Sequence, residues 1–268
     1  CQWCSNPESF HSHPQLMARD AKCILCGKCA AVCPKGAITI NEKSGRIVDR
    51  SKCDLCLLCA MSCPTGSLSA SGQYMTVDEV MEEIVKDELF YSNSGGGVTI
   101  SGGEPLMQAE FVASLLQECH RKSIHTALES AGYIPPEKLA LVLPYVNLLL
   151  FDTKQLDTEK HKQGTGKGNE LILDNLHYAA GKVRTWLRLP LIPGFNDSDD
   201  NLSGVAKLAL KLGVDKISLL PYHKLGGQKY TYLDVIFVLD SLAEPSAEYI
   251  ENRANFLKSC GVNVTIGN

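Results

Sequence analysis

Cys1-Gln2-Trp3-Cys4-Ser5-Asn6-Pro7-Glu8 is the stretch on which the interpretation of the whole chain depends, because two cysteines lie three positions apart around a tryptophan. A C-x-x-C pair alone is compatible with a zinc site, a redox disulfide or two ligands of an iron–sulfur cluster. The plainest alternative is a truncated structural metal site. The other motifs of the chain must therefore decide which chemistry applies.

Two longer cysteine runs follow, offset by thirty residues, and each has the spacing C-x2-C-x2-C-x3-C-P. In bacterial ferredoxins this spacing places the fourth cysteine of each run on the other cluster. One [4Fe–4S] cluster is therefore predicted on Cys23, Cys26, Cys29 and Cys63, and a second on Cys53, Cys56, Cys59 and Cys33. Zinc sites would not need eight cysteines in this register. Electron relay is the favoured role of the two clusters, and a purely structural role is the alternative.

The composition narrows the class of protein and its environment. The chain has 268 residues, 44% of them hydrophobic, and a net charge of −4 without a basic run, so nucleic-acid binding is not expected. No apolar stretch reaches transmembrane length, so we expect no membrane association. Ten of the twelve cysteines lie within the first 63 residues in metal-ligand spacing. That usage predicts a reducing compartment, and hence a cytoplasmic protein.

Apolar periodicity predicts strands that alternate with helices along the rest of the chain. Residues 146–151 are apolar apart from Asn147, a run typical of a parallel strand buried on both faces, whereas residues 76–89 have an amphipathic helical pattern. Strands are expected at 98–101, 124–130, 146–151, 183–192, 216–220 and 262–266, and helices at 76–89, 105–119, 136–143, 169–180, 201–212 and 247–259. The charged, glycine-rich residues 157–168 predict a solvated loop. This order indicates an α/β fold with a parallel sheet.

Three polar motifs follow predicted strand ends, where α/β barrels keep their chemistry: Gly102-Gly103-Glu104, Asp152-Thr153-Lys154 and His223. A fourth candidate, Arg188, lies on the strand predicted at 183–192. Each has a structural alternative: a strand-to-helix turn, a local salt bridge, a structural histidine and a barrel-lining ion pair, respectively. Taken singly, none of the four motifs identifies a function.

In their order along the chain the motifs resemble those of radical S-adenosylmethionine (SAM) enzymes, and C-x-W-C-S-N-P-E resembles the cluster loop of the glycyl radical enzyme activating enzymes. The first cysteine of that loop would lie four residues before Cys1, so we expect the chain to be a fragment that also lacks the first barrel strand. The resemblance implies a partial (β/α)6 TIM-like radical SAM barrel formed by residues 1–15 and 71–268. A ferredoxin-like insert with two [4Fe–4S] clusters would occupy residues 16–70.

The resemblance also implies a cofactor set and a reaction. Three thiolates would leave one iron of a third [4Fe–4S] cluster open for SAM, by the logic that separates catalytic from structural metal sites. Catalytic roles would belong to Cys1, Cys4, Lys154 and His223, with Cys1 and Cys4 on the third cluster. SAM would be held by Trp3, Cys4, Ser5, Gly102, Gly103, Glu104, Asp152, Thr153, Lys154, Arg188 and His223.

The expected reaction is reductive cleavage of SAM followed by abstraction of hydrogen from a backbone glycine of a partner glycyl radical enzyme. Flavodoxin or ferredoxin would supply electrons, and the activase would act as a monomer. Two alternatives stay open. One is a radical SAM enzyme acting on a small molecule or a peptide. The other is a ferredoxin-type electron-transfer module carrying an inert barrel.

Overall fold

The computed structural model describes residues 1–41 and 43–267, and the chain divides into two compact units. The barrel unit comprises Cys1–Gln2, Met75–His223 and the residues from Ser241 onward. The ferredoxin unit comprises Trp3–Tyr74 and Lys224–Asp240. By contacts, therefore, residues 3–15 and 224–240 group with the cysteine-rich segment. The insert boundaries given above, residues 16–70, stay a prediction.

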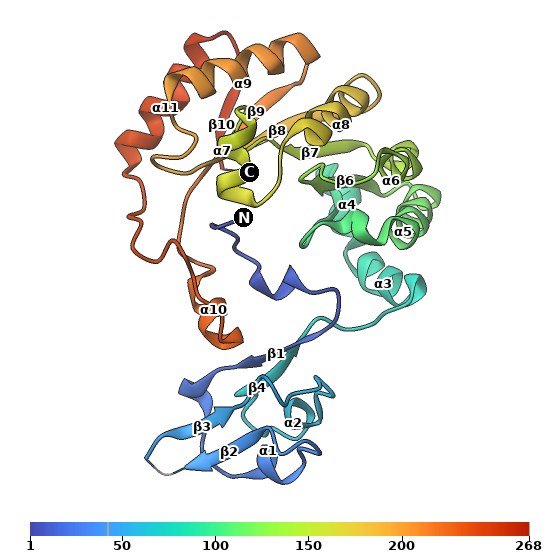
Figure 1. Ribbon diagram of the computed structural model, residues 1–268. Coiled ribbons are helices and arrows are strands. Elements are labelled where there is room, and N and C mark those ends of the chain that lie inside the picture. The colour runs from blue at the N-terminus through green and yellow to red at the C-terminus, as the bar shows by residue number, and fades with distance from the viewer. Residues whose placement is uncertain (42, 268) are drawn as a thin grey trace. The chain divides into compact units, whose positions relative to one another are not determined.

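The barrel unit is built on a six-stranded sheet whose described strands are all parallel and whose order is β10-β9-β8-β7-β6-β5 (Figure 1). Its strands are β5 (Gly97–Ile100), β6 (His125–Ser130), β7 (Leu148–Asp152), β8 (Arg184–Leu191), β9 (Lys216–Pro221) and β10 (Val264–Ile266). Neighbours in the sheet are neighbours in sequence, as expected for successive βαβ units. The predicted α/β class with a parallel sheet is confirmed.

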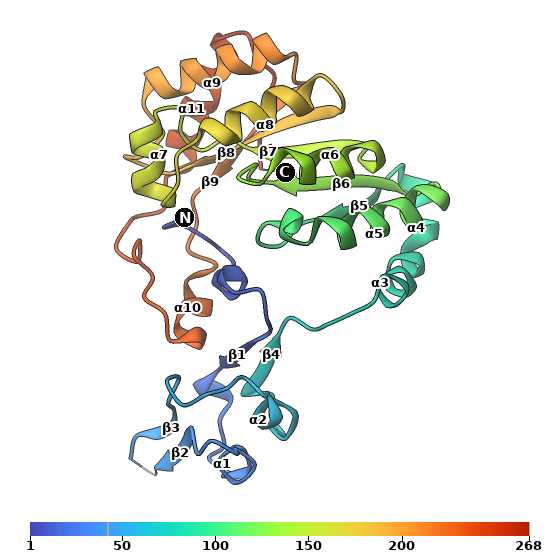
Figure 2. The same cartoon turned by 45° about the vertical axis from the view of Figure 1, so that its right-hand side comes forward.

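Helices cover one face of this sheet, as Figures 1 and 2 show for α5, α6, α8, α9 and α11. Apart from α7 (Thr158–Thr165), the α-helices described in this unit are α3 (Val77–Ile84), α4 (Glu88–Ser94), α5 (Ala109–Arg121), α6 (Pro136–Val142), α8 (Glu170–Ala180), α9 (Asp199–Leu212) and α11 (Ala247–Ser259). Local signals fix their ends: Thr76 and Glu79 form a capping box at the start of α3, and Gly213 ends α9 at φ 65°. Fully buried leucines, including Leu116, Leu149 and Leu187, pack the helices against the sheet.

The expectation of a solvated loop at residues 157–168 is wrong, because the structure has helix α7 (Thr158–Thr165) there. Asp157 caps this helix by accepting a hydrogen bond from the Lys160 N–H at 2.9 Å, and Gly166 ends it at φ 85°. The buried residues of α7 are His161 and Gly164 rather than aliphatic residues. The apolar periodicity that predicts an amphipathic helix is therefore missing from this segment.

Within its described residues, the ferredoxin unit contains two short two-stranded sheets and three short α-helices. β1 (Gln15–Ala18) pairs antiparallel with β4 (Leu68–Ser71), and β2 (Ile38–Asn41) with β3 (Gly45–Val48). Helices α1 (Lys28–Ala31) and α2 (Leu58–Met61) begin thirty positions apart, in line with the duplication. A small core of Leu16, Ile38 and Leu68 packs with Cys29 and Cys59. The third helix, α10 (Gly227–Leu233), was not predicted from the sequence.

None of the helices in the described ranges, 1–41 and 43–267, combines the length and hydrophobicity that crossing a bilayer requires.

Candidate functional site

The eight cysteines of the duplicated runs line two separate cavities in the ferredoxin unit. Cys23, Cys26, Cys29 and Cys63 line the first, and Cys33, Cys53, Cys56 and Cys59 line the second. Each cavity thus takes three cysteines from one run and the fourth from the other, which is the arrangement that two crossed [4Fe–4S] clusters require. The residues present fit two such clusters, and the ligation itself stays a prediction.

The cysteines surround a space rather than meet at a point. Thiolates on one Zn²⁺ lie about 2.3 Å from the ion, and so within about 4 Å of one another. Among the described residues, no group of three or more His, Cys, Asp or Glu side chains is placed to hold a single metal ion. Burial raises the pKa of Cys59 to about 11 and also raises that of Cys29, so metal ligation must displace protons from these thiols. Four thiolates of this kind are the donor set that closes a [4Fe–4S] cluster.

Cys4 lies in the ferredoxin unit, where helix α10 holds the loop around it. The Tyr230 hydroxyl donates to the Cys4 carbonyl at 2.9 Å, and the Asn6 N–H donates to Cys4 Sγ at 3.4 Å. Lys229 Nζ contacts Asn6 Oδ1 at 2.9 Å and Glu8 Oε1 at 2.6 Å. The predicted ligand-binding residues Trp3 and Ser5 are half-buried in the same loop. Tyr230 and Lys229 were missed, because nothing local in the sequence connects them to positions more than 220 residues away.

Cys1, by contrast, belongs to the barrel unit and is exposed, and the neighbouring Gln2 is bound to helix α7. The Gln2 N–H donates to the Gly164 carbonyl at 3.0 Å, and its side-chain amide donates to the Gln163 carbonyl at 3.1 Å. Helix α7, which was not predicted from the sequence, therefore binds Gln2 and holds the neighbouring Cys1 within the barrel unit.

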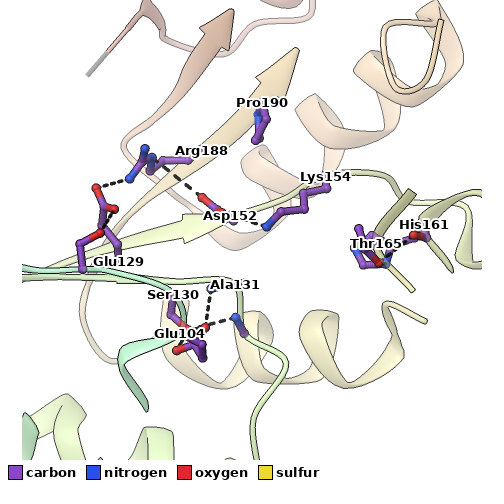
Figure 3. Close-up of polar contacts among 12 residues, drawn as sticks. Glu104, Glu129, Ser130, Ala131, Asp152, Lys154, His161, Thr165, Arg188 and Pro190 are labelled. Carbon is purple, nitrogen blue, oxygen red and sulfur yellow. Dashed lines mark hydrogen bonds and ion pairs between the residues drawn. The ribbon is translucent and has the colours of Figure 1, made fainter. Parts of the chain in front are cut away.

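The buried His161 ring stabilises the C-terminal turn of α7. Its Nδ1 lies 2.7 Å from the Lys167 carbonyl and 3.1 Å from Thr165 Oγ1 (Figure 3). Burial lowers the pKa of His161, with the charge of Lys154 adding to the effect, although the bond to Lys167 opposes it. The ring therefore favours the neutral form, and its role here is structural.

Glu104, at the carboxyl end of the β5 segment, binds the end of β6. Its carboxylate accepts hydrogen bonds from Ser130 Oγ at 3.0 Å, from the Ala131 N–H at 2.9 Å and from the Leu106 N–H at 3.2 Å (Figure 3). Burial raises the pKa of Glu104, and these hydrogen bonds oppose the rise. The preceding Gly102 is exposed and has φ 138°, a conformation that favours glycine, and Gly103 is exposed beside it. The side chain of Glu104 thus shapes the turn, and the glycine backbone is accessible to a ligand.

Four charged side chains form a network across the carboxyl ends of three adjacent strands. Asp152 and Arg188 are register partners on β7 and β8, and Arg188 Nε lies 3.9 Å from Asp152 Oδ1. Arg188 also forms an ion pair with Glu129 on β6, and Lys154 Nζ lies 2.8 Å from Asp152 Oδ2. Figure 3 shows the Arg188 guanidinium directed between the two carboxylates. Glu129 is the member that the sequence analysis did not select, although it too lies at a predicted strand end.

Two buried donors, one in this network and one on the residue between Asp152 and Lys154, have no hydrogen-bond partner within the described ranges. They are Thr153 Oγ1 and Arg188 Nε. Because buried polar groups are normally satisfied, such atoms are candidates for ligand contacts. SAM carries a carboxylate, an amino group and ribose hydroxyls, and both signs of charge are available here. The residues Asp152, Thr153, Lys154 and Arg188 therefore fit a polar zwitterionic ligand.

His223 lies two residues beyond the end of β9, at the same edge of the sheet, and it is exposed. Since β9 is next to β8 in the sheet, His223 follows the strand that neighbours the one carrying Arg188.

Comparison with known proteins gives consistent matches. The sequence profile of the radical SAM superfamily matches residues 55–203, and that of a 4Fe-4S dicluster domain matches residues 22–67. The isethionate sulfite-lyase activating enzyme of Nitratidesulfovibrio vulgaris is 42% identical, over 87% of this chain and 78% of the relative. The indoleacetate decarboxylase activating enzyme of Tractidigestivibacter scatoligenes is 40% identical, over 99% of this chain and 88% of the relative.

Among solved structures, a domain of the pyruvate-formate lyase-activating enzyme from Bacteroides vulgatus is similar, with 32% identity and a TM-score of 0.54. The match covers 65% of this chain and 99% of that domain. A radical SAM methyltransferase from Sphaerobacter thermophilus, at 17% identity and a TM-score of 0.53, shares the fold.

Proposed function

Because this chain belongs to the radical SAM superfamily and, within it, to the glycyl radical enzyme activating enzymes, we propose that it abstracts hydrogen from one backbone glycine of its partner with a 5′-deoxyadenosyl radical made from SAM. The observation that carries this proposal is the 40% identity to an activating enzyme over 99% of the chain. The relatives are named for a sulfite-lyase and a decarboxylase, so the chemistry of the partner's own substrate stays open.

The cofactors proposed are SAM and three [4Fe–4S] clusters. Cys1 and Cys4, with a third cysteine, would hold the cluster that binds SAM, and the two cysteine-lined cavities of the ferredoxin unit would hold the others. When bound, the three-cysteine cluster supplies the low-potential electron that cleaves the sulfonium of SAM. The Asn6 N–H···Sγ contact to Cys4 is the kind of hydrogen bond that tunes such a cluster.

The chain's own residues bind and orient SAM in this proposal. Lys154 and Arg188 supply positive charge for its carboxylate, while Asp152 supplies a carboxylate for its amino group or ribose hydroxyls. The Glu104 carboxylate fixes the glycine turn so that the backbone of Gly102 and Gly103 can approach the ligand. Lys154 is only 8% exposed, so its charge acts where water screens it little.

His223, Trp3 and Ser5 complete the proposed ligand set. His223 extends the carboxyl edge beyond β9, and Trp3 and Ser5 flank Cys4 in the loop held by α10. We assign catalytic roles to Cys1, Cys4, Lys154 and His223.

The partner set follows the same proposal. A flavodoxin or ferredoxin would deliver electrons to the insert clusters, and the activase would work as a cytoplasmic monomer under anaerobic conditions. No basic run supports nucleic-acid binding.

The test is anaerobic incubation of the reconstituted complete protein with SAM, a reductant and a candidate partner glycyl radical enzyme. We expect 5′-deoxyadenosine in the products and a glycyl radical EPR signal on the partner. Absence of both products from protein with full iron content would reject the activase function.

A further inference from the structure

Helix α10 and its N-cap residue contact the cysteine loop at three positions, all within the ferredoxin unit. Tyr230 binds the carbonyl of Cys4, and Lys229 binds the side chains of Asn6 and Glu8. Gly226, at the N-cap of the helix, lies so close to Ser5 that a Cβ there would be 2.7 Å from the Ser5 Cα. The helix therefore holds the loop by hydrogen bonds, an ion pair and close backbone packing.

The packing around Tyr230 keeps its hydroxyl aimed at the loop. Its ring lies 4.7 Å from that of Phe237 and 6.1 Å, edge to face, from that of Phe10, measured between centroids. The Tyr230 side chain is buried, so its hydrogen bond to the Cys4 carbonyl is shielded from water. A hydrogen bond in such surroundings has a fixed geometry and is costly to leave unmade.

The same helix also contacts the segment that carries the second cysteine set. Arg50 donates to the Tyr232 carbonyl at 2.9 Å and to the Leu16 carbonyl at 2.7 Å. Cys53 and Leu55 line both the cavity of the second cysteine set and a larger cavity, which Pro7, Phe10, Arg50 and the end of α10 also line. The cavity of the first set shares no lining residue with this larger one. Helix α10 thus contacts both the Cys4 loop and the segment that carries Cys53.

We propose that α10 is a positioning element for the SAM cluster, in which Tyr230 and Lys229 act through the Cys4 loop and hold it beside the second cysteine set. The inference rests on the proposed function. Lys229 fixes the side chain of Asn6, and the N–H of the same residue donates to Cys4 Sγ. Because hydrogen bonds to cluster sulfurs raise the reduction potential, a loosened loop makes the SAM cluster harder to reduce.

The test compares two tyrosines of the same helix in the complete, reconstituted protein. Tyr230→Phe removes the hydroxyl that binds Cys4 and keeps the ring packing. Tyr232→Phe is the matched control, because its hydroxyl binds only Gln228 of the same helix among the hydrogen bonds described, at 3.1 Å. Lys229→Met removes the contacts to Asn6 and Glu8, and Lys229→Arg is the conservative variant that should restore them.

The readout is an EPR redox titration in which the SAM cluster is identified as the signal that changes on addition of SAM. We expect Tyr230→Phe and Lys229→Met to lower the midpoint potential of that signal and to slow 5′-deoxyadenosine formation about two- to tenfold, the effect of one ordinary hydrogen bond. The signals of the two insert clusters should keep their wild-type potentials, as should all signals in Tyr232→Phe and Lys229→Arg.

Two results would overturn the inference: a SAM-responsive signal in Tyr230→Phe identical to that in Tyr232→Phe, or an equal shift of the insert signals, which would make α10 merely a folding element. Failure of the proposed function looks different, because the wild-type protein itself would then lack a SAM-responsive signal.

Discussion

Gly226→Ala tests the close packing of the Cys4 loop against the N-cap of α10. Gly226 has φ −76° and ψ −15°, so alanine meets no backbone strain there. Its Cβ, however, would lie 2.7 Å from the Ser5 Cα and 2.9 Å from the Ser5 carbonyl oxygen. Ordinary contact begins at 3.4 Å, so Ser5 must retreat by about 0.7 Å (3.4 minus 2.7). The obstructing atoms are backbone rather than the end of a flexible side chain.

The expected cost follows from overpacking, which typically destabilises by about 1–3 kcal/mol. Because the clash is confined to the loop, we expect the loop to give way rather than the whole unit. At about 1.4 kcal/mol per tenfold change, the population with a correctly seated loop falls about 5- to 150-fold. The assay is 5′-deoxyadenosine formation with the SAM-responsive EPR signal, and insert-cluster signals report whether the ferredoxin unit is intact.

Gly227→Ala is the matched control for this change. A Cβ at Gly227 would meet Phe237 at 3.6 Å, an ordinary contact, and we expect an effect within about 0.5 kcal/mol. Equal activity and equal SAM-responsive signals in Gly226→Ala and Gly227→Ala would refute the reasoning, since the two positions differ chiefly in their contact with Ser5.

Three further predictions concern the clusters, the glycine turn and α7. Cys63→Ser should remove the cluster held with Cys23, and Cys33→Ser should remove the cluster held with Cys53. Mössbauer and EPR spectra measure both losses, and loss of the same signal in both variants would contradict the crossed assignment. Glu104→Ala should leave Ser130 Oγ and the Ala131 N–H without their acceptor and destabilise the protein by about 1–3 kcal/mol in thermal unfolding. Calorimetry should also show weaker SAM binding, and unchanged stability and affinity would argue against the role of Glu104 in the turn. His161 has a lowered pKa in the folded state, so its contribution to stability is complete above the unfolded pKa of about 6.5 and is lost as the pH falls. In His161→Asn, the free energy of unfolding should therefore depend less steeply on pH below about 6.5. A pH dependence equal to that of the wild type would contradict this.

The parallel sheet could be predicted from the sequence because its strands carry strong local signals. Residues 148–151, for example, are continuously apolar between Asn147 and Asp152, and the structure has β7 at Leu148–Asp152. The short helices α7 and α10 lack such a signal. Helix α7 has a mostly polar sequence, and its buried positions are His161 and Gly164 rather than aliphatic residues.

The site divides in the same way between local and long-range information. Asp152 and Lys154 could be selected because they follow a predicted strand at alternate positions. Glu129 joins them through its ion pair with Arg188. That contact depends on the register that aligns β6, β7 and β8, which no local sequence motif predicts. The contact of Tyr230 with Cys4 is a still longer connection, between residues 226 positions apart.

In the proposed function, this chain transfers a hydrogen atom from a glycine of its partner to the 5′-deoxyadenosyl fragment of SAM. The most direct measurement supplies the partner with its glycines deuterated at Cα and analyses the 5′-deoxyadenosine by mass spectrometry. We predict one deuterium in each 5′-deoxyadenosine that accompanies the appearance of a glycyl radical. Formation of the glycyl radical with 5′-deoxyadenosine that carries no deuterium would contradict the account.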